Sequence, residues 1–161
     1  APTWAPKGHR PILRRVTKDR RAVSTAVGLT MSGKIYQRQY EGGLKSKQIV
    51  EVLKHLHRYL FKGFVLVWDR GKIHRSAETK AYLTAHPEIV VEWLPPYAPE
   101  LNPEEFCHGN VKRRLKNATP ADAKEMHKLL NRGFARLRHR ADLLLGFIHE
   151  AGLTVKQLWL T

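Results

Sequence analysis

The sequence predicts an α/β domain in which a mixed sheet is flanked by helices. Two short apolar runs carry this prediction, Phe-Val-Leu-Val-Trp at 64–68 and Ile-Val-Val-Glu-Trp-Leu at 89–94. The first run shows no alternation with polar residues, which is typical of a parallel strand buried on both faces. An amphipathic helix is predicted at 45–61 and a shorter one at 77–85. Strands and helices therefore alternate along this part of the chain.

The N-terminal part of the chain predicts an antiparallel hairpin. Residues 22–30 are small and β-branched. Along residues 34–40, Ile35, Gln37 and Gln39 alternate with Tyr36, Arg38 and Tyr40, as the two faces of a half-exposed strand do. A turn is expected at 32–33, where Ser precedes Gly. Residues 1–21 are rich in proline and cations, and a short strand at 12–16 is expected there. That segment is either a solvated hairpin or an edge that contacts phosphate.

The helix at 45–61 carries apolar residues at helical spacing, with Ser46 as the expected N-cap. His55 and His57 lie two residues apart on it. They do not share a helical face, as zinc ligands spaced i,i+4 do. Both are therefore expected to be surface histidines.

The C-terminal part of the chain is predicted to be helical. A helix is expected from 103 to about 116, with Asn102 as its N-cap and Pro103 in its first turn. Apolar residues at helical spacing predict further helices at 121–138 and 142–160. We expect 1–161 to form a single domain, on which the helices of 121–161 dock.

The chain is strongly basic. Its 161 residues contain 29 Lys and Arg against 14 Asp and Glu, which gives a net charge of +15. Such an excess favours nucleic acid as a partner, ahead of an anionic membrane surface. No apolar run approaches the ~20 residues that span a bilayer. The single Cys107 excludes an internal disulfide framework and a cysteine-based zinc site, so a reducing intracellular compartment is expected.

Two carboxylates follow the predicted parallel strands. Asp69 ends the run at 64–68, and the run at 89–94 leads through a proline-rich turn to Glu105. The carboxyl ends of parallel strands meet at one rim of a sheet, where α/β proteins place their sites. Mg²⁺ is held by one or two carboxylates together with substrate phosphate. The alternative is structural: Asp69 caps a turn, and Glu105 complements the helix dipole in a first turn.

Two motifs resemble those of a known family. Residues 67–76 (Val-Trp-Asp-Arg-Gly-Lys-Ile-His-Arg-Ser) resemble the second-aspartate motif of DDE transposases of the Tc1/mariner and bacterial IS630 group. Residues 94–105 (Leu-Pro-Pro-Tyr-Ala-Pro-Glu-Leu-Asn-Pro-Glu-Glu) resemble the third-carboxylate motif of that group, and residues 3–8 resemble a segment just after its first aspartate. The resemblance implies a ribonuclease H-like fold, whose element order the chain follows from residue 22 onward.

The resemblance implies a two-metal endonuclease and strand transferase. In that family, three carboxylates hold two Mg²⁺ or Mn²⁺ ions. Asp69 matches the second carboxylate, and Glu105 matches the third, rather than Glu104 or Glu100. The residues expected to position this site are His74, which otherwise serves as a loop hydrogen-bonder, and Asn102.

The partner implied by the resemblance is DNA, both transposon ends and target, in the bacterial cytoplasm at the nucleoid. A homodimer on paired DNA ends is implied by the resemblance alone. Cations near the two motifs are the expected DNA contacts: Arg70, Lys72, Arg75, Lys112, Arg113 and Arg114.

The chain departs from the family pattern in two places. Arg70 stands where the family usually has Asn, and it is expected to pair with Asp69 or with phosphate. The first aspartate is expected on a central strand upstream of Thr3, since Asp19 lies in a cationic turn. Without that strand, hydrogen-bonding edges are exposed on both sides of the gap. Two functions stay open: an N-terminally incomplete transposase catalytic domain, or a non-catalytic, basic, nucleic-acid-binding remnant of one.

Overall fold

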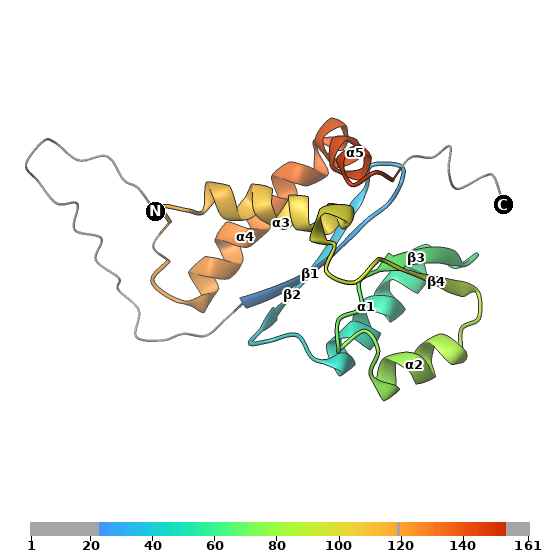
Figure 1. Ribbon diagram of the computed structural model, residues 1–161. Coiled ribbons are helices and arrows are strands. Elements are labelled where there is room, and N and C mark those ends of the chain that lie inside the picture. The colour runs from blue at the N-terminus through green and yellow to red at the C-terminus, as the bar shows by residue number, and fades with distance from the viewer. Residues whose placement is uncertain (1–22, 119, 154–161) are drawn as a thin grey trace, which may run out of the picture.

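The computed structural model describes residues 23–118 and 120–153 (Figure 1). The strand expected at 12–16 and residues 154–160 of the helix predicted at 142–160 lie outside these ranges. The described elements are, in chain order, β1 (Val23–Leu29), β2 (Ile35–Glu41), α1 (Ser46–Tyr59), β3 (Phe64–Trp68), α2 (Ala77–Thr84), β4 (Ile89–Trp93), the short 3-10 helix η1 (Pro99–Leu101), α3 (Pro103–Arg114), α4 (Ala123–Arg138) and α5 (Ala141–Glu150).

Strands β1 and β2 form the predicted antiparallel hairpin. Their register runs from Val23 opposite Glu41 to Leu29 opposite Ile35. Gly33 closes the turn with a φ of 73°, a conformation that glycine adopts without strain. The hairpin separates two groups of helices: α3, α4 and α5 lie on one side of it, and α1 lies on the other (Figure 1).

Strands β3 and β4 form the predicted parallel pair, with α2 as the crossover between them. The expectation that β3 is buried on both faces is wrong. Val65 is 52% exposed and its neighbour Val90 on β4 is 50% exposed, whereas Ile89 is buried. Side chains alternate between the faces of a strand, and only one face of this pair is packed against the protein. The lack of alternation in this apolar run therefore did not indicate that both faces of the strand are buried.

The hydrogen-bonded strands form two separate pairs among the described residues, one antiparallel and one parallel. Helices pack beside both pairs, and the element order follows the one expected from residue 22 onward. The α/β class with mixed strands and flanking helices is thus confirmed.

Helix α1 begins at Ser46, so the predicted N-cap is wrong by one residue. The capping position is Lys45, and the side chain of Gln48 accepts a hydrogen bond from its backbone N–H at 2.6 Å. The Gln48 N–H, which an N-cap serine hydroxyl would accept, is bonded instead to the Lys45 carbonyl at 3.0 Å. The buried face of α1 lies against the hairpin at Gly28, through Leu56.

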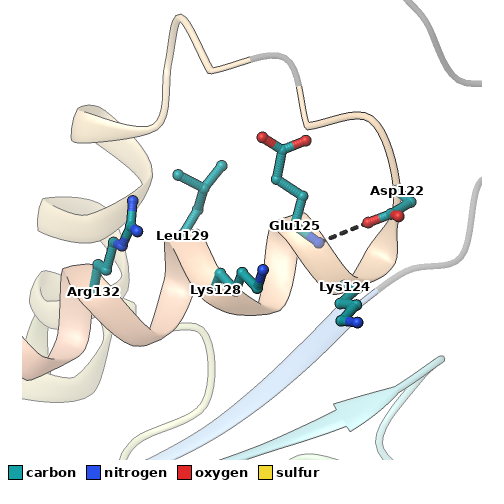
Figure 2. A pocket seen from close by; sticks show the side chains of 6 residues that line it. All are labelled: Asp122, Lys124, Glu125, Lys128, Leu129 and Arg132. Atoms are coloured by element: carbon teal, nitrogen blue, oxygen red, sulfur yellow. Dashed lines mark hydrogen bonds between the residues drawn. The ribbon is translucent and has the colours of Figure 1, made fainter.

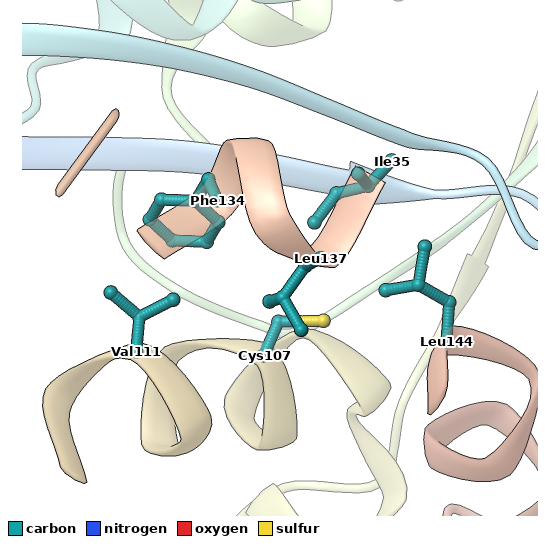
Figure 3. Packing of buried hydrophobic residues seen from close by; sticks show 6 residues of the cluster. All are labelled: Ile35, Cys107, Val111, Phe134, Leu137 and Leu144. Carbon is teal, nitrogen blue, oxygen red and sulfur yellow. The ribbon is translucent and has the colours of Figure 1, made fainter. Parts of the chain in front are cut away.

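The main core forms where the last three helices meet the hairpin (Figure 3). Phe134 and Leu137 on α4 have no exposed surface. The helices α3 and α4 cross closely, since a Cβ atom on Gly133 would lie 2.8 Å from Val111. The cluster that unites the elements consists of Ile35, Cys107, Val111, Phe134, Leu137 and Leu144.

Cys107 should react with alkylating reagents only when the core opens. Its side chain is fully buried, and this burial, together with the nearby Glu104 carboxylate, raises the pKa of the thiol to about 12. Because the thiolate is the nucleophile, iodoacetamide at pH 8 should modify the native protein more than about a hundredfold more slowly than the unfolded protein. Mass spectrometry measures this directly, since the sequence has one cysteine. Equal alkylation rates with and without urea would contradict the burial of the Cys107 thiol.

No helix among the described residues is long and apolar enough to cross a bilayer.

Candidate active site

The carboxyl ends of β3 and β4 lie side by side. Trp68 pairs with Trp93 in the ladder, and their rings stack with centroids 6.4 Å apart. Leu94 donates its backbone N–H to the carbonyl of Trp68 at 2.7 Å, and Arg70 donates from Nε to the Leu94 carbonyl at 3.3 Å. The segments that follow the two strands are therefore tied together at this edge. Arg70 makes this backbone contact, rather than an ion pair with Asp69, in the described part of the chain.

Asp69 follows β3 directly and is held through one carboxylate oxygen. Its Oδ1 accepts a hydrogen bond from the Gly71 N–H at 2.8 Å and lies 2.7 Å from His74 Nδ1. The other oxygen, Oδ2, has no hydrogen-bond partner among residues 23–118 and 120–153, and the side chain is 51% exposed. The turn therefore fixes the carboxylate and leaves one oxygen available to a ligand.

His74 lies against both Asp69 and the end of β3. Its ring stacks on Trp68 with centroids 4.0 Å apart, and its side chain is 14% exposed. In the tautomer with a proton on Nδ1, the ring donates to Asp69 Oδ1. The structure thus brings together two of the predicted site residues, and the contact serves both interpretations of His74 offered by the sequence.

Asn102 caps helix α3, as predicted. Its side-chain oxygen accepts the backbone N–H of Glu104 at 3.1 Å, and its carbonyl accepts that of Glu105 at 3.0 Å. Glu104 contacts His108 one turn later, at 2.9 Å between Oε1 and Nε2. Glu105 is exposed and makes no side-chain hydrogen bond within the described residues. Among the described residues, Glu105 thus has no side-chain partner, whereas one oxygen of Glu104 is engaged by His108.

No group of three or more metal-ligand side chains among the described residues includes Asp69 or Glu105. Both are exposed carboxylates. Carboxylate oxygens are ligands that Mg²⁺ and Mn²⁺ prefer. Six cations predicted to contact DNA are also exposed: Arg70, Lys72, Arg75, Lys112, Arg113 and Arg114.

Tyr97 is a residue of this edge that the sequence analysis did not single out. It lies in the proline-rich turn after β4, with a positive φ of 60° and a fully exposed ring. A left-handed backbone at a bulky residue is uncommon and is often found at functional sites. The two prolines before it were the available signal, because they stiffen the turn that presents the ring.

A hollow of about 380 Å³ lies elsewhere, along the first turns of α4 (Figure 2). Its side chains come from this helix and its cap, where Glu125 N–H donates to Asp122. None of the predicted site residues lines it. The Asp69 side chain, 51% exposed, is not part of this hollow.

His57 belongs to a side-chain cluster that the spacing of histidines on the helix did not predict. Its Nε2 atom lies 2.9 Å from Glu88, which also contacts His86. Spacing within one helix could not reveal this cluster, because its partners come from the turn before β4. His55 does not join it and packs edge-on against Tyr59.

A family model described as DDE superfamily endonuclease matches residues 1–127, which is more than half of the chain. The chain therefore belongs to this family of endonucleases. The match covers both motifs that carry Asp69 and Glu105.

Two solved structures are similar to this chain. The crystal structure of the Mos1 strand transfer complex is similar with a TM-score of 0.57 and 15% identity, over 94% of this chain and 50% of that one. The crystal structure of the Mos1 mariner paired end complex with Mn has a TM-score of 0.49 and 17% identity, over 89% and 49%. The chain thus spans about half the length of the chains that it matches. No curated protein matches it.

The first of these similarities confirms the ribonuclease H-like fold class. The family model confirms the resemblance to DDE endonucleases, and the Mos1 chain is similar to this one in fold.

Proposed function

We propose that this chain is the catalytic domain of an IS630-type DDE transposase, which cleaves DNA and transfers strands with two Mg²⁺ or Mn²⁺ ions. The observation that carries the proposal is the state of Asp69: its carboxylate is fixed through Oδ1 at the end of a parallel strand, with Oδ2 available. Membership of the DDE superfamily endonucleases supports it.

Each site residue has a stated part in this proposal. Asp69 and Glu105 would hold the metal ions in this proposal. Such ions would activate a water or a DNA 3′-OH and stabilise the leaving oxygen of the scissile phosphate. His74 keeps the Asp69 carboxylate in place, and Asn102 starts α3 so that Glu105 lies in its first turn.

DNA is the proposed substrate, because the net charge of +15 suits a polyanion and the Mos1 structure is described as a strand transfer complex. The six exposed cations named above would contact its phosphates. The exposed ring of Tyr97 is placed to stack on an unpaired base or a sugar. The full proposal includes one domain over 1–161, a homodimer on paired ends, and a location at the bacterial nucleoid.

The assignment of Glu105 predicts a difference between two neighbouring variants. Glu105→Gln should weaken Mn²⁺ binding by about tenfold or more, because a direct oxygen ligand loses its charge. Glu104→Gln should change it by less than about twofold, because Glu104 is engaged with His108. Titration of Mn²⁺, followed by the electron paramagnetic resonance signal of the free ion, measures both variants.

Circular dichroism of both variants checks that α3 is intact. A larger loss of Mn²⁺ binding in Glu104→Gln than in Glu105→Gln would assign the third carboxylate to Glu104 instead. Equal binding in the wild type and both variants, with DNA binding retained, would favour a non-catalytic nucleic-acid-binding remnant instead.

A further inference from the structure

Three potential metal ligands from separate parts of the chain meet at one point. His57 lies in the last turn of α1, and His86 and Glu88 lie in the turn between α2 and β4. Glu88 Oε1 is 2.9 Å from His57 Nε2 and 3.1 Å from His86 Nδ1. The two imidazole rings stand nearly perpendicular, with centroids 4.8 Å apart. Among the residues that the structure describes, this is the one group of three or more such ligands.

The backbone beneath the cluster is held on several sides. The carbonyl of Glu88 accepts the N–H of Phe64, and the carbonyl of His86 accepts the N–H of Ile89. Gly63 approaches so closely that a Cβ atom there would lie 2.5 Å from the Glu88 carbonyl oxygen. The turn is therefore fixed against the start of β3, and the ligands need only side-chain adjustment to bind an ion.

The donor set has the chemistry of a transition-metal site. Two imidazoles and one carboxylate are ligands that zinc takes, and three protein ligands leave a fourth position for water. Zn–N bonds of 2.0–2.1 Å place tetrahedral ligand atoms about 3.3 Å apart. The two measured contacts to Glu88 are close to this value, and all three ligand atoms lie within 4.8 Å of one another. Each neutral imidazole would change its tautomer to present a lone pair.

The charge and exposure of the cluster suit an ion from solvent. The side chains of His57, His86 and Glu88 are 20%, 33% and 36% exposed, which leaves a path for entry. Glu88 contributes a carboxylate, whose negative charge favours a cation between the two imidazoles.

The cluster is separate from the candidate active site. It lies where β3 and β4 begin, next to Phe64 and Ile89, whereas Asp69 follows the end of β3. Five residue steps along a strand place the two sites roughly 16 Å apart. An ion at the cluster would therefore not reach a phosphate held at Asp69.

We propose that His57, His86 and Glu88 form a second metal site, which binds one divalent transition ion of the zinc type. The ion joins the end of α1 to the turn before β4, so it stabilises the fold rather than taking part in phosphoryl transfer. This site does not depend on the proposed function, because it shares no residue with the candidate active site.

Zinc binding to the untagged chain tests this proposal. Isothermal titration with ZnCl₂ in excess Mg²⁺ should show one site, because Mg²⁺ occupies exposed carboxylates but does not compete well for imidazole. Glu88→Gln and His57→Ala should each weaken that site by more than about tenfold. Zinc should also raise the melting temperature of the wild type and not that of Glu88→Gln. Visible absorption of bound Co²⁺ should report a tetrahedral site in the wild type and not in Glu88→Gln.

His55→Ala is the matched control, since it removes a histidine from the same helix two residues away. It should bind zinc as the wild type does, and so should Asp69→Asn. Equal zinc affinity in the wild type, His57→Ala and Glu88→Gln would overturn the proposal, because the ion would then lie elsewhere. Absence of zinc binding in a folded wild type would also overturn it and leave a hydrogen-bonded cluster.

Discussion

Asp69→Asn lowers metal-dependent DNA cleavage by about a thousandfold or more, if the proposed two-metal mechanism holds. Asparagine keeps Oδ1, so the hydrogen bond from Gly71 and the contact with His74 can persist. What the substitution removes is the negative charge, and with it a metal ligand. Initial rates of plasmid cleavage by the purified protein, measured in Mg²⁺ and in Mn²⁺, give the effect.

Asp142→Asn is the matched control for a lost carboxylate charge. Asp142 lies on α5, where the hydrogen bond from Arg140 lowers the pKa of its carboxyl to about 2. It is therefore charged at the assay pH, as Asp69 must be to hold a metal ion. Cleavage by Asp142→Asn should stay within about twofold of the wild type. A similar loss in both variants, or more than a tenth of the rate left in Asp69→Asn, would remove Asp69 from the mechanism.

DNA binding separates the role of the metal from that of the cations. Asp69→Asn should bind DNA at least as tightly as the wild type, because it removes a negative charge near phosphate. A parallel loss of binding and cleavage would indicate instead that the turn had collapsed.

The elements of this fold that could be predicted are those whose signal is local. The hairpin has alternating side chains and a Ser-Gly turn, and Asn102 before Pro103 has the chemistry of a helix start. The structure confirms both. The contact of His74 with Asp69 was partly predictable as well, because only four residues of turn lie between them.

The features that could not be predicted depend on contacts between distant segments. Burial of β3 on one face depends on which elements pack against it, and an apolar run does not carry that information. The engagement of His57 with Glu88 joins residues 31 positions apart through the pairing of two strands. The strained backbone of Tyr97 is likewise set by the geometry of its turn rather than by its own propensity.

Phe134→Ala should destabilise the fold by about 3–5 kcal/mol, the usual cost of removing a buried phenylalanine. The ring has no exposed surface and packs in the core that joins α3, α4 and β2, edge-on against His108. The neighbouring helices cannot move together to fill the cavity that the ring leaves, because α4 at Gly133 already lies against Val111 on α3. Such a loss is a large part of the ~5–15 kcal/mol that stabilises a domain. Urea unfolding followed by circular dichroism measures the change.

Leu129→Ala tests whether position in the core, rather than loss of apolar surface from α4, sets this cost. Leu129 lies on the same helix beside the open hollow (Figure 2), where it is only partly buried. Its substitution should cost about 1 kcal/mol. Equal losses for the two variants would mean that the core seen in Figure 3 does not dominate the stability of this part of the fold.

The alkylation rate of Cys107 provides an independent measure of the same loss. Cys107 belongs to the core cluster of Phe134, so its thiol becomes accessible when that core opens. If opening is global and fast, each 1.4 kcal/mol of lost stability should accelerate alkylation about tenfold. Phe134→Ala should therefore speed the reaction by a hundredfold or more, at about 3 kcal/mol, and Leu129→Ala by less than about tenfold. Acceleration without a matching shift in the urea midpoint would show that α3 opens locally, and that the core is less cooperative than its packing indicates.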